Sequence, residues 1–205
     1  MTQQTDGRRV VTNMSLSLDG RYAAPGDPTD MRWVMPYAVT DVARDHLADL
    51  CSTATTALLG RVNAEGFLGF WPTVIGMPGA DPRDEAFARW LVDADKVVLS
   101  STLGHATVEA AAWERTTIVD RPTTEVVAGL RAGDGGDVLV LSSASVIQTL
   151  LAADQVDRLA LNVFPVFLGG GPRLFDDGLP AARWTLTSQA AGEHGTLALV
   201  YDRVR

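Results

Sequence analysis

The chain has 205 residues, of which 46% are hydrophobic, and its 25 acidic and 17 basic side chains give a formal net charge of -8. This length and apolar content suit one sizeable core, so we expect a single domain over residues 1–205. The acidic balance, without a basic cluster, argues against a nucleic-acid partner, and the lack of an apolar run of roughly 20 residues argues against a membrane span.

The N-terminal segment predicts a strand that runs into a turn and a loop. Residues 8–18 mix β-branched and alternating apolar side chains and end at Asp19 and Gly20, a pair typical of turns. The stretch AAPGDPTDMRW at 23–33 is rich in Pro, Gly and Asp and therefore predicts an irregular loop. We interpret this loop as a flap beside the first strand.

A helix, a buried strand and a second helix are expected next. Thr40 is suited to cap a helix over 41–52. The apolar spacing of that helix gives the candidates for its buried side, which are Val42, Leu47, Leu50 and Cys51. TTALLG at 55–60 predicts a short buried strand, and DEAFARWL at 84–91 predicts a helix that begins with acidic residues.

Strand and helix signals continue to alternate toward the C-terminus. Strands are predicted at KVVLSS (96–101), TTIV (116–119) and VLVL (138–141), with a helix over 123–131. The final segments, ARWTLTSQAA and TLALVYDRV, predict an antiparallel hairpin joined through GEHG. The whole pattern indicates an α/β fold with a mixed sheet that is mostly parallel and ends in antiparallel strands.

The stretch from Val138 to Phe175 carries the clearest functional pattern. It predicts a buried strand, a tight serine-rich turn, an amphipathic helix, a second strand and a loop containing three consecutive glycines at 169–171. A short turn that leads into a helix presents unpaired backbone N–H groups and the positive end of the helix dipole, which together favour a phosphate. We therefore expect this turn to hold a cofactor. The glycine loop has an alternative interpretation as a structural connection.

Four segments in chain order carry a family resemblance: NMSLSLDGRYAAPGD, LLGRVNAEGF, KVVLSSTL, and the 138–175 stretch with its PVFLGGGPRLF ending. Together they resemble the dihydrofolate reductase-like superfamily, most closely the branch homologous to the reductase domain of bacterial riboflavin biosynthesis. The resemblance runs nearly end to end. It implies a three-layer fold with helices on both faces of a mixed, mostly parallel sheet and a C-terminal antiparallel hairpin.

The same resemblance implies an NADPH-dependent reductase of a small heterocyclic or carbonyl/imine substrate, and a homodimer. It places the cofactor against four turns, whose matching residues are Ser17 and Gly20; Gly60, Arg61 and Asn63; Ser100, Ser101 and Thr102; and Ser142, Ser143, Ala144 and Ser145. A guanidinium such as that of Arg61 can grip a phosphate through two parallel hydrogen bonds. The alternatives are a surface arginine at a turn and, for residues 100–102, a polar strand exit or helix cap.

Two further residues are candidates for the chemistry itself. Asp19 is a candidate catalytic residue that orients substrate or a proton-donating water, because hydride transfer to C=N or C=O also needs a proton. The alternative, which we prefer, is a turn in which Asp19 bonds nearby backbone and Gly20 permits positive φ. Trp33 is a candidate wall for a flat substrate, with a core position as the alternative.

The turn LSSAS departs from the family pattern, in which glycines let the backbone approach the pyrophosphate. The serines either cap the helix and offer hydroxyls to phosphate, or their Cβ atoms crowd the site. The second possibility leads to an alternative function, a non-catalytic ligand-binding or interaction protein on the same fold. Synthesis of the ribitylamino pyrimidine intermediate of riboflavin is disfavoured, because the zinc-ligand motifs of the deaminase often fused to that enzyme are absent.

Metal and disulfide chemistry are not expected. Cys51 is the sole cysteine, and His46, His105 and His194 are isolated and lack the spacing of metal ligands. The first residues, MTQQTDGRR, lack the apolar core of a signal peptide. The expected protein is cytoplasmic and its expected partner is a small-molecule substrate.

Overall fold

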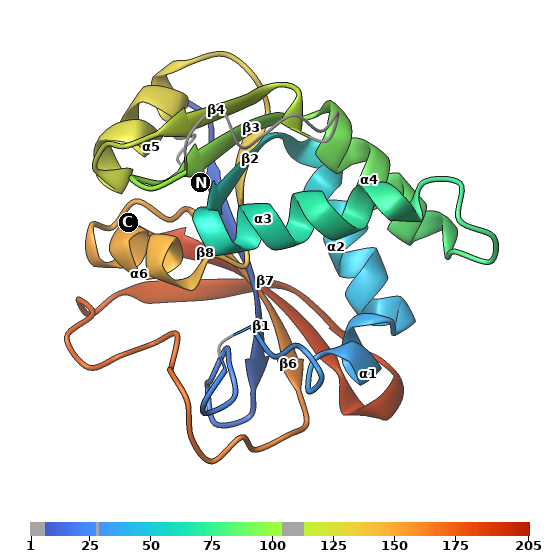
Figure 1. Ribbon diagram of the computed structural model, residues 1–205. Coiled ribbons are helices and arrows are strands. Elements are labelled where there is room, and N and C mark those ends of the chain that lie inside the picture. The colour runs from blue at the N-terminus through green and yellow to red at the C-terminus, as the bar shows by residue number, and fades with distance from the viewer. Residues whose placement is uncertain (1–6, 28, 104–112) are drawn as a thin grey trace.

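The computed structural model describes residues 7–27, 29–103 and 113–205 (Figure 1). Its strands are β1 (Val10–Ser17), β2 (Ala54–Gly60), β3 (Asp95–Leu99), β4 (Thr116–Val119), β5 (Asp137–Leu141), β6 (Arg158–Phe164), β7 (Arg183–Ala191) and β8 (Leu197–Val204). Within the described residues they form one sheet in the order β4-β3-β2-β5-β1-β6-β8-β7.

The sheet is parallel from β4 to β6 and antiparallel at its C-terminal end. β1 lies between β5 and β6, parallel to both, whereas β8 pairs antiparallel with β6 and with β7. All five residues of β5 are buried, as expected for a central strand covered on both faces. The predicted mixed sheet with a closing hairpin is confirmed.

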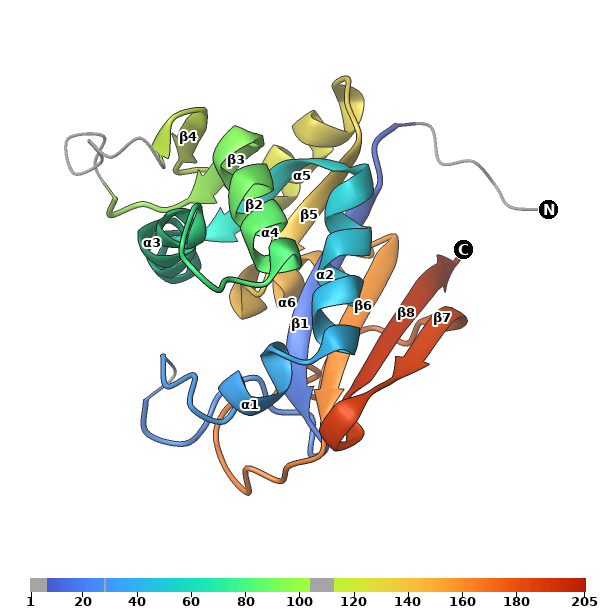
Figure 2. The same ribbon diagram turned by 90° about the vertical axis from the view of Figure 1, so that its right-hand side faces the viewer.

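Helices cover both faces of the sheet and make three layers (Figures 1 and 2). The helices are α1 (Met35–Ala38), α2 (Asp41–Thr53), α3 (Arg61–Phe70), α4 (Pro82–Asp93), α5 (Thr123–Ala132) and α6 (Ala144–Ala152), with short 3-10 turns η1 (Trp71–Val74) and η4 (Glu193–Gly195). One apolar core lies between the sheet and α5 and α6. The other lies between the opposite face and α2, α3 and α4.

Helix α2 differs in two details from its sequence prediction. Thr40 is the residue that precedes the helix, but its hydroxyl donates to the carbonyl of Tyr37 at 2.7 Å and caps no helical N–H. The buried residues of α2 are Val42, Ala43, His46 and Leu50, while Leu47 and Cys51 are only partly buried. The short helix α1 was not predicted, because it lies beside a stretch whose Pro and Gly content indicated a loop.

Lys96 closes the C-terminal end of α4 from inside the protein. The residue is 1% exposed, and its Nζ donates to the carbonyls of Leu91, Val92 and Ala94 at 2.8–3.1 Å. The last carbonyls of a helix have no partner within the helix, so this ammonium group satisfies acceptors that would otherwise be buried and unpaired. An apolar stem and a fully bonded head make a buried lysine tolerable here.

Among the residues that the structure describes, none of the helices combines the length and apolar composition of a membrane span.

Candidate functional site

Four predicted cofactor turns meet at one edge of the sheet. The strands β3, β2, β5 and β1 are consecutive neighbours and parallel, so their C-terminal ends point the same way. Ser100, Gly60, Ser142 and Ser17 stand at or directly after these ends. In open α/β sheets this edge is the usual place for ligands. The structure therefore brings together segments that lie far apart in the sequence.

Two of these turns are joined by side-chain hydrogen bonds. The backbone N–H of Gly60 donates to Oγ of Ser143 at 2.9 Å, and the Ser143 hydroxyl donates to the carbonyl of Leu141 at 2.8 Å. Asn63 adds hydrogen bonds from Nδ2 to the carbonyls of Ser142 and Leu141. Since Gly60 precedes α3 and Ser143 precedes α6, these bonds hold the two helix N-termini together.

Neither helix N-terminus has a side-chain cap among the described residues. The first N–H groups of a helix lack partners within it, and Ala144 and Ser145 occupy that position in α6. Ser145 is exposed and Ala144 is buried. Two neighbouring helix N-termini present several N–H donors and positive dipole ends to one region, which suits the phosphates of a nucleotide.

The serine-rich turn adopts a backbone conformation that favours glycine. Ser142 has φ of 46°, in the left-handed region, where a Cβ is crowded against neighbouring backbone. The residue belongs to the turn in which the family resemblance leads us to expect glycines. Ser142 therefore keeps the conformation of the turn, and its left-handed φ costs conformational free energy.

Arg61 and the residues that follow β3 lie at the rim of this edge. Arg61 is exposed and pairs with Glu65 at 2.9 Å, one helical turn away. The Ser100 hydroxyl accepts from the backbone N–H of Thr102 and Leu103, which matches its alternative role as a local cap. Ser101 and Thr102 are exposed. The guanidinium and two hydroxyls are thus accessible to a ligand.

Asp19 connects the first-strand exit, the turn that follows the C-terminal end of β1, to the glycine loop at 169–171. Its carboxylate accepts from the Ser17 hydroxyl at 2.7 Å, from Arg21 Nε at 2.8 Å, and from the backbone N–H groups of Leu168 and Gly169 at 3.1 Å. The hydrogen bond from Ser17, followed by those from Leu168 and Arg21, holds the pKa of Asp19 well below its ordinary range.

This environment favours the turn role of Asp19 over direct acid catalysis, because a carboxyl with a lowered pKa is ionised at neutral pH and is a poor proton donor. Gly20 has φ of 74°, in keeping with a turn. The partner loop packs closely, since a Cβ on Gly171 would lie 2.2 Å from the carbonyl oxygen of Ala23. The glycine loop therefore acts here as the structural connection considered from its sequence.

Trp33 lies against the C-terminal end of β6. Its ring meets Phe164 edge to face at 6.1 Å, and Tyr37 of α1 stacks on the same Phe164 at 5.1 Å. Trp33 Nε1 is buried and has no hydrogen-bond partner among the described residues. The aromatic group formed by Trp33, Tyr37 and Phe164 stands at the C-terminal end of β6.

Three buried polar residues on this side received no functional role in the sequence analysis, which named His46 only as an isolated histidine. Asn13 in β1, Asn162 in β6 and His46 in α2 are each no more than 8% exposed. Their Oδ1, Oδ1 and Nε2 atoms have no hydrogen-bond partner in the described part of the chain. The sequence signal that could have pointed to the two asparagines is an asparagine inside a strand that is predicted to be buried. Burial lowers the pKa of His46 to about 4, so its imidazole is neutral at pH 7.

No group of three or more potential metal ligands occurs in the described ranges, which omit His105. His194 is exposed in the β7–β8 connection.

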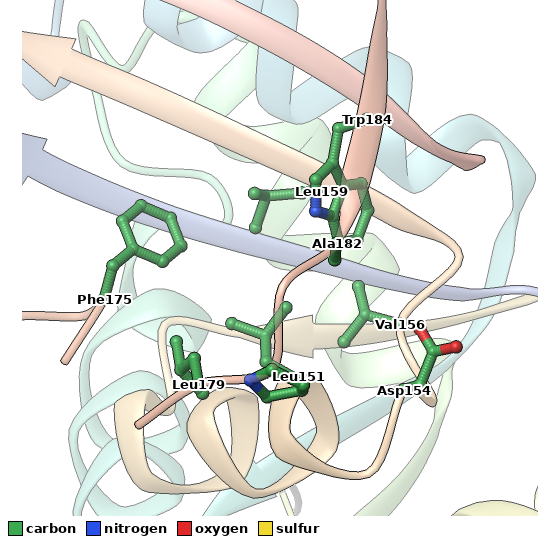
Figure 3. A pocket seen from close by; sticks show the side chains of 9 residues that line it. Leu151, Asp154, Val156, Leu159, Phe175, Leu179, Ala182 and Trp184 are labelled. Atoms are coloured by element: carbon green, nitrogen blue, oxygen red, sulfur yellow. The ribbon is translucent and has the colours of Figure 1, made fainter. Parts of the chain in front are cut away.

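A separate apolar pocket lies on the α6 side of the sheet (Figure 3). Its volume is about 170 Å³, and it is lined by Leu151, Asp154, Val156, Leu159, Phe175, Leu179, Pro180, Ala182 and Trp184. None of the predicted site residues lines it. Leu151 stands near the C-terminal end of α6, so the pocket is at the end of this helix opposite Ser143.

Comparisons with known proteins agree with the fold and the resemblance. The model of the family described as the RibD C-terminal domain matches residues 8–198. The uncharacterised protein YyaP of Bacillus subtilis strain 168 is 24% identical over 201 residues, which cover 98% of each chain.

Two solved structures share the fold of this chain. A putative riboflavin biosynthesis protein from Shewanella sp. PV-4 has a TM-score of 0.68 and 20% identity, covering 96% of this chain and 99% of its own. A pyrimidine reductase-like protein from Corynebacterium diphtheriae has a TM-score of 0.65 and 15% identity, covering 97% of this chain and 92% of its own. The predicted three-layer fold is confirmed.

Proposed function

Because this chain belongs to the RibD C-terminal domain family, we propose that it is an NADPH-dependent reductase that transfers hydride to a small heterocyclic or carbonyl/imine substrate. Its fold is of the reductase type. The observation that carries the proposal is the bonding of Gly60 to Ser143, which keeps two uncapped helix N-termini together at one sheet edge. Such a pair of N-termini fits the phosphates of a dinucleotide.

The residues at this edge fit the cofactor by their chemistry. The N–H groups at the start of α3 and α6 would donate to the pyrophosphate, and the guanidinium of Arg61 would be available to a further phosphate. The exposed hydroxyls of Ser101 and Thr102 suit the ribose and its 2′-phosphate. Ser100 has a supporting role, because its hydroxyl already accepts two backbone N–H groups of the same turn.

When bound, NADPH supplies the hydride from C4 of its nicotinamide. The chain itself orients the substrate and places a proton source near the C-terminal end of β1. In this proposal Asp19 is a positioning residue: it stays ionised and fixes Ser17, Arg21 and the glycine loop. Water then delivers the proton.

A calorimetric titration of NADPH and NADP⁺ tests the proposal directly. Absence of binding of either nucleotide at millimolar concentration would contradict the proposed reductase function. Arg61 and Arg89 make a matched pair for this test, since each is an exposed arginine paired with a glutamate four residues away. Arg61→Ala is expected to weaken NADPH binding about tenfold, the usual worth of one charge-assisted hydrogen bond, whereas Arg89→Ala leaves it unchanged.

A second candidate function is a non-catalytic ligand-binding protein on the same fold. Two observations favour it. The N–H of Gly60 already donates to the Ser143 hydroxyl, and Ser142 has a side chain at a left-handed φ that favours glycine. This alternative predicts no substrate-dependent oxidation of NADPH. If Ser142→Gly leaves NADPH affinity unchanged, the idea that this serine obstructs the cofactor loses its support.

We also propose that the chain forms a homodimer through its C-terminal strands. β7 is an edge strand whose nine residues, apart from Trp184, are exposed, and Leu186 and Leu197 are among the exposed large apolar residues. An exposed edge strand of this length is a surface that proteins normally cover. Sedimentation equilibrium of the wild type and of Leu186→Glu tests this, with the monomer expected for the variant.

A further inference from the structure

The apolar pocket of Figure 3 is formed by three segments that are distant in the sequence. The end of α6 and the segment after it contribute Leu151 and Val156, the sheet contributes Leu159 and Trp184, and the loop before β7 contributes Phe175. Val156 and Leu159 are buried members of the core beneath α5 and α6, so this core fixes the bottom of the pocket. A ligand would therefore enter a space that the fold itself shapes.

The volume of the pocket limits its occupant to a small molecule. The pocket measures about 170 Å³, and a dry cavity of roughly 150 Å³ lined by Leu, Ile and Phe binds benzene in an engineered protein. One aromatic ring with a small substituent therefore fits this space. A dinucleotide is far too large for it, so the pocket is not a part of the proposed cofactor site.

Two aromatic side chains give the pocket flat walls. Phe175 is 40% exposed, so part of its ring is open to contact, and Figure 3 shows Trp184 on a different side of the pocket. Arg203 supports the indole, because its guanidinium carbon lies 5.8 Å from the ring centroid and its Nη1 donates to the backbone carbonyl of Arg183 at 3.2 Å. Aromatic rings favour edge-to-face or offset stacked contacts with other rings. These walls therefore suit an aromatic occupant.

Asp154 supplies the one charged side chain among the described residues that line the pocket. Its Oδ1 accepts from Arg203 Nε at 2.7 Å, its side chain is 49% exposed, and no described residue donates to its Oδ2. Asp154 follows the end of α6 with φ of 52°, in the left-handed region where glycine is usual and Asp or Asn is tolerated. The turn therefore holds a carboxylate at the edge of the pocket with one oxygen available.

We propose that this pocket binds a small molecule with one aromatic ring and a hydroxyl or amine substituent that donates to Oδ2 of Asp154. The ring lies against Leu159, Phe175 and Trp184, and its apolar surface leaves water on binding. The carboxylate selects the substituent, because a hydrogen bond to an ionised acceptor is about twice as strong as one between neutral groups. This binding site goes beyond the proposed reductase function and does not rest on it.

The proposed ring site and the proposed cofactor turn lie at opposite ends of α6. The helix has nine residues and is therefore roughly 13 Å long. Ser143 precedes its first residue, and Asp154 comes after its last. A ring at one end does not occupy the other end, so the ring and NADPH should bind at the same time.

Phenol and toluene are matched probes, because both have one six-membered aromatic ring and only phenol has a donor. Calorimetry at millimolar ligand should show that the wild type binds phenol more tightly than toluene. Asp154→Asn removes the charge at a residue type that tolerates the left-handed φ, so it should lower the affinity for phenol about fivefold and leave that for toluene unchanged.

Asp177→Asn is the control for the Asp154 variant, because Asp177 is an exposed aspartate in the loop before β7 that does not line the pocket. It should bind both probes like the wild type. Absence of phenol binding to the wild type, or equal losses in the two variants, would overturn the proposal.

A larger side chain at position 182 tests the pocket itself. Ala182 lines the pocket and is exposed, so Ala182→Phe should place a ring in this space without disturbing the core. The variant should keep the urea midpoint of the wild type and bind neither probe. Undiminished phenol binding to Ala182→Phe would show that the ring binds elsewhere and would overturn the proposal.

A further measurement uses the unchanged chain. In ¹⁵N-resolved NMR spectra, phenol should shift the indole N–H signal of Trp184. The indole N–H of Trp90 is the reference that should stay, because it donates to the carbonyl of Ala54 at 2.9 Å in the core on the opposite face of the sheet. An unshifted Trp184 signal at millimolar phenol, or a shift of Trp33 alone, would overturn the proposal.

Two titrations separate this site from the other proposals. Saturation with phenol should leave NADPH binding unchanged, and competition between the two ligands would overturn the assignment to this pocket. Leu186→Glu should bind phenol like the wild type. If this variant alone binds phenol, a second copy of the chain fills the pocket in the wild type, which contradicts the proposal. A failure of NADPH to bind would remove the reductase and leave the prediction for phenol unchanged.

Discussion

The backbone N–H of Gly60 donates to Oγ of Ser143, although the two residues are 83 positions apart in the chain. This bond ties the turn before α3 to the turn before α6. It also gives a structural reason for a serine in the turn where the family resemblance leads us to expect glycines: a glycine at 143 would lack the hydroxyl that accepts from Gly60 and donates to Leu141. The serine-rich turn is therefore integrated into its surroundings by bonds that glycine does not provide.

Removal of the Ser143 hydroxyl should loosen this connection. Ser143→Ala leaves the N–H of Gly60 without its acceptor in a partly buried place, so we expect a loss of about 1–2 kcal/mol in the free energy of unfolding. Urea denaturation measures this loss, and Ser145→Ala, at an exposed position, should leave stability nearly unchanged. Equal stability of Ser143→Ala and the wild type would contradict the role given to this hydroxyl.

Glycine at position 142 should stabilise the protein. The left-handed φ of Ser142 costs a residue with a Cβ about 1 kcal/mol, which glycine avoids. Ser142→Gly is therefore expected to raise the urea midpoint modestly. Ser145→Gly, within the first turn of α6, should lower it because glycine is a poor helix former. A lower midpoint for Ser142→Gly would show that the strain is absent or offset.

Loss of the Asp19 carboxylate should release the glycine loop from the first-strand exit. In Asp19→Ala the N–H groups of Leu168 and Gly169 lose their acceptor, so their hydrogen exchange should accelerate, on the order of tenfold for one lost bond. Exchange within β5, remote from this contact, serves as the internal reference. If Asp19 instead acts only as a proton donor, exchange at these two amides stays at the wild-type rate.

The buried imidazole of His46 should make stability depend on pH. Its pKa falls from 6.5 to about 4 because burial disfavours the charged form, an effect that Asp49 partly opposes. Between these two values the unfolded chain binds a proton that the folded chain does not. The free energy of unfolding therefore decreases as pH falls through this window, by up to about 3 kcal/mol from this group.

Denaturation curves between pH 7 and pH 4 measure this contribution. His46→Leu should flatten the pH dependence, whereas His194→Asn, at an exposed residue, should keep the wild-type slope. An unchanged slope in His46→Leu would indicate that other groups cause the acid sensitivity.

The order of the elements could be predicted because their local signals are strong. VLVL and TLALVYDRV have the apolar content of strands. The helices that alternate with the central strands return the chain to the same end of the sheet, so these strands run parallel. The common edge of the cofactor turns follows from that direction. α1 gave no comparable signal, since four residues next to a Pro- and Gly-rich loop are too short for a helical period.

The detailed roles of the site residues could not be predicted, because they depend on contacts distant in sequence. Ser143 meets Gly60, and Asp19 meets Leu168 and Gly169, only after the sheet has assembled. Asn13 and Asn162 were overlooked because each is one polar residue within an apolar strand. Their shared face depends on the register of β1 with β6, which a single sequence does not reveal.

The position of Lys96 has a practical consequence for chemical labelling. It is the sole lysine in the sequence, and the folded protein hides it with its Nζ held by three carbonyls. Amine-reactive dyes and crosslinkers should therefore leave this lysine of the native protein untouched. The rate at which Lys96 becomes labelled would then report how often α4 and β3 open, through a probe that the chain already contains.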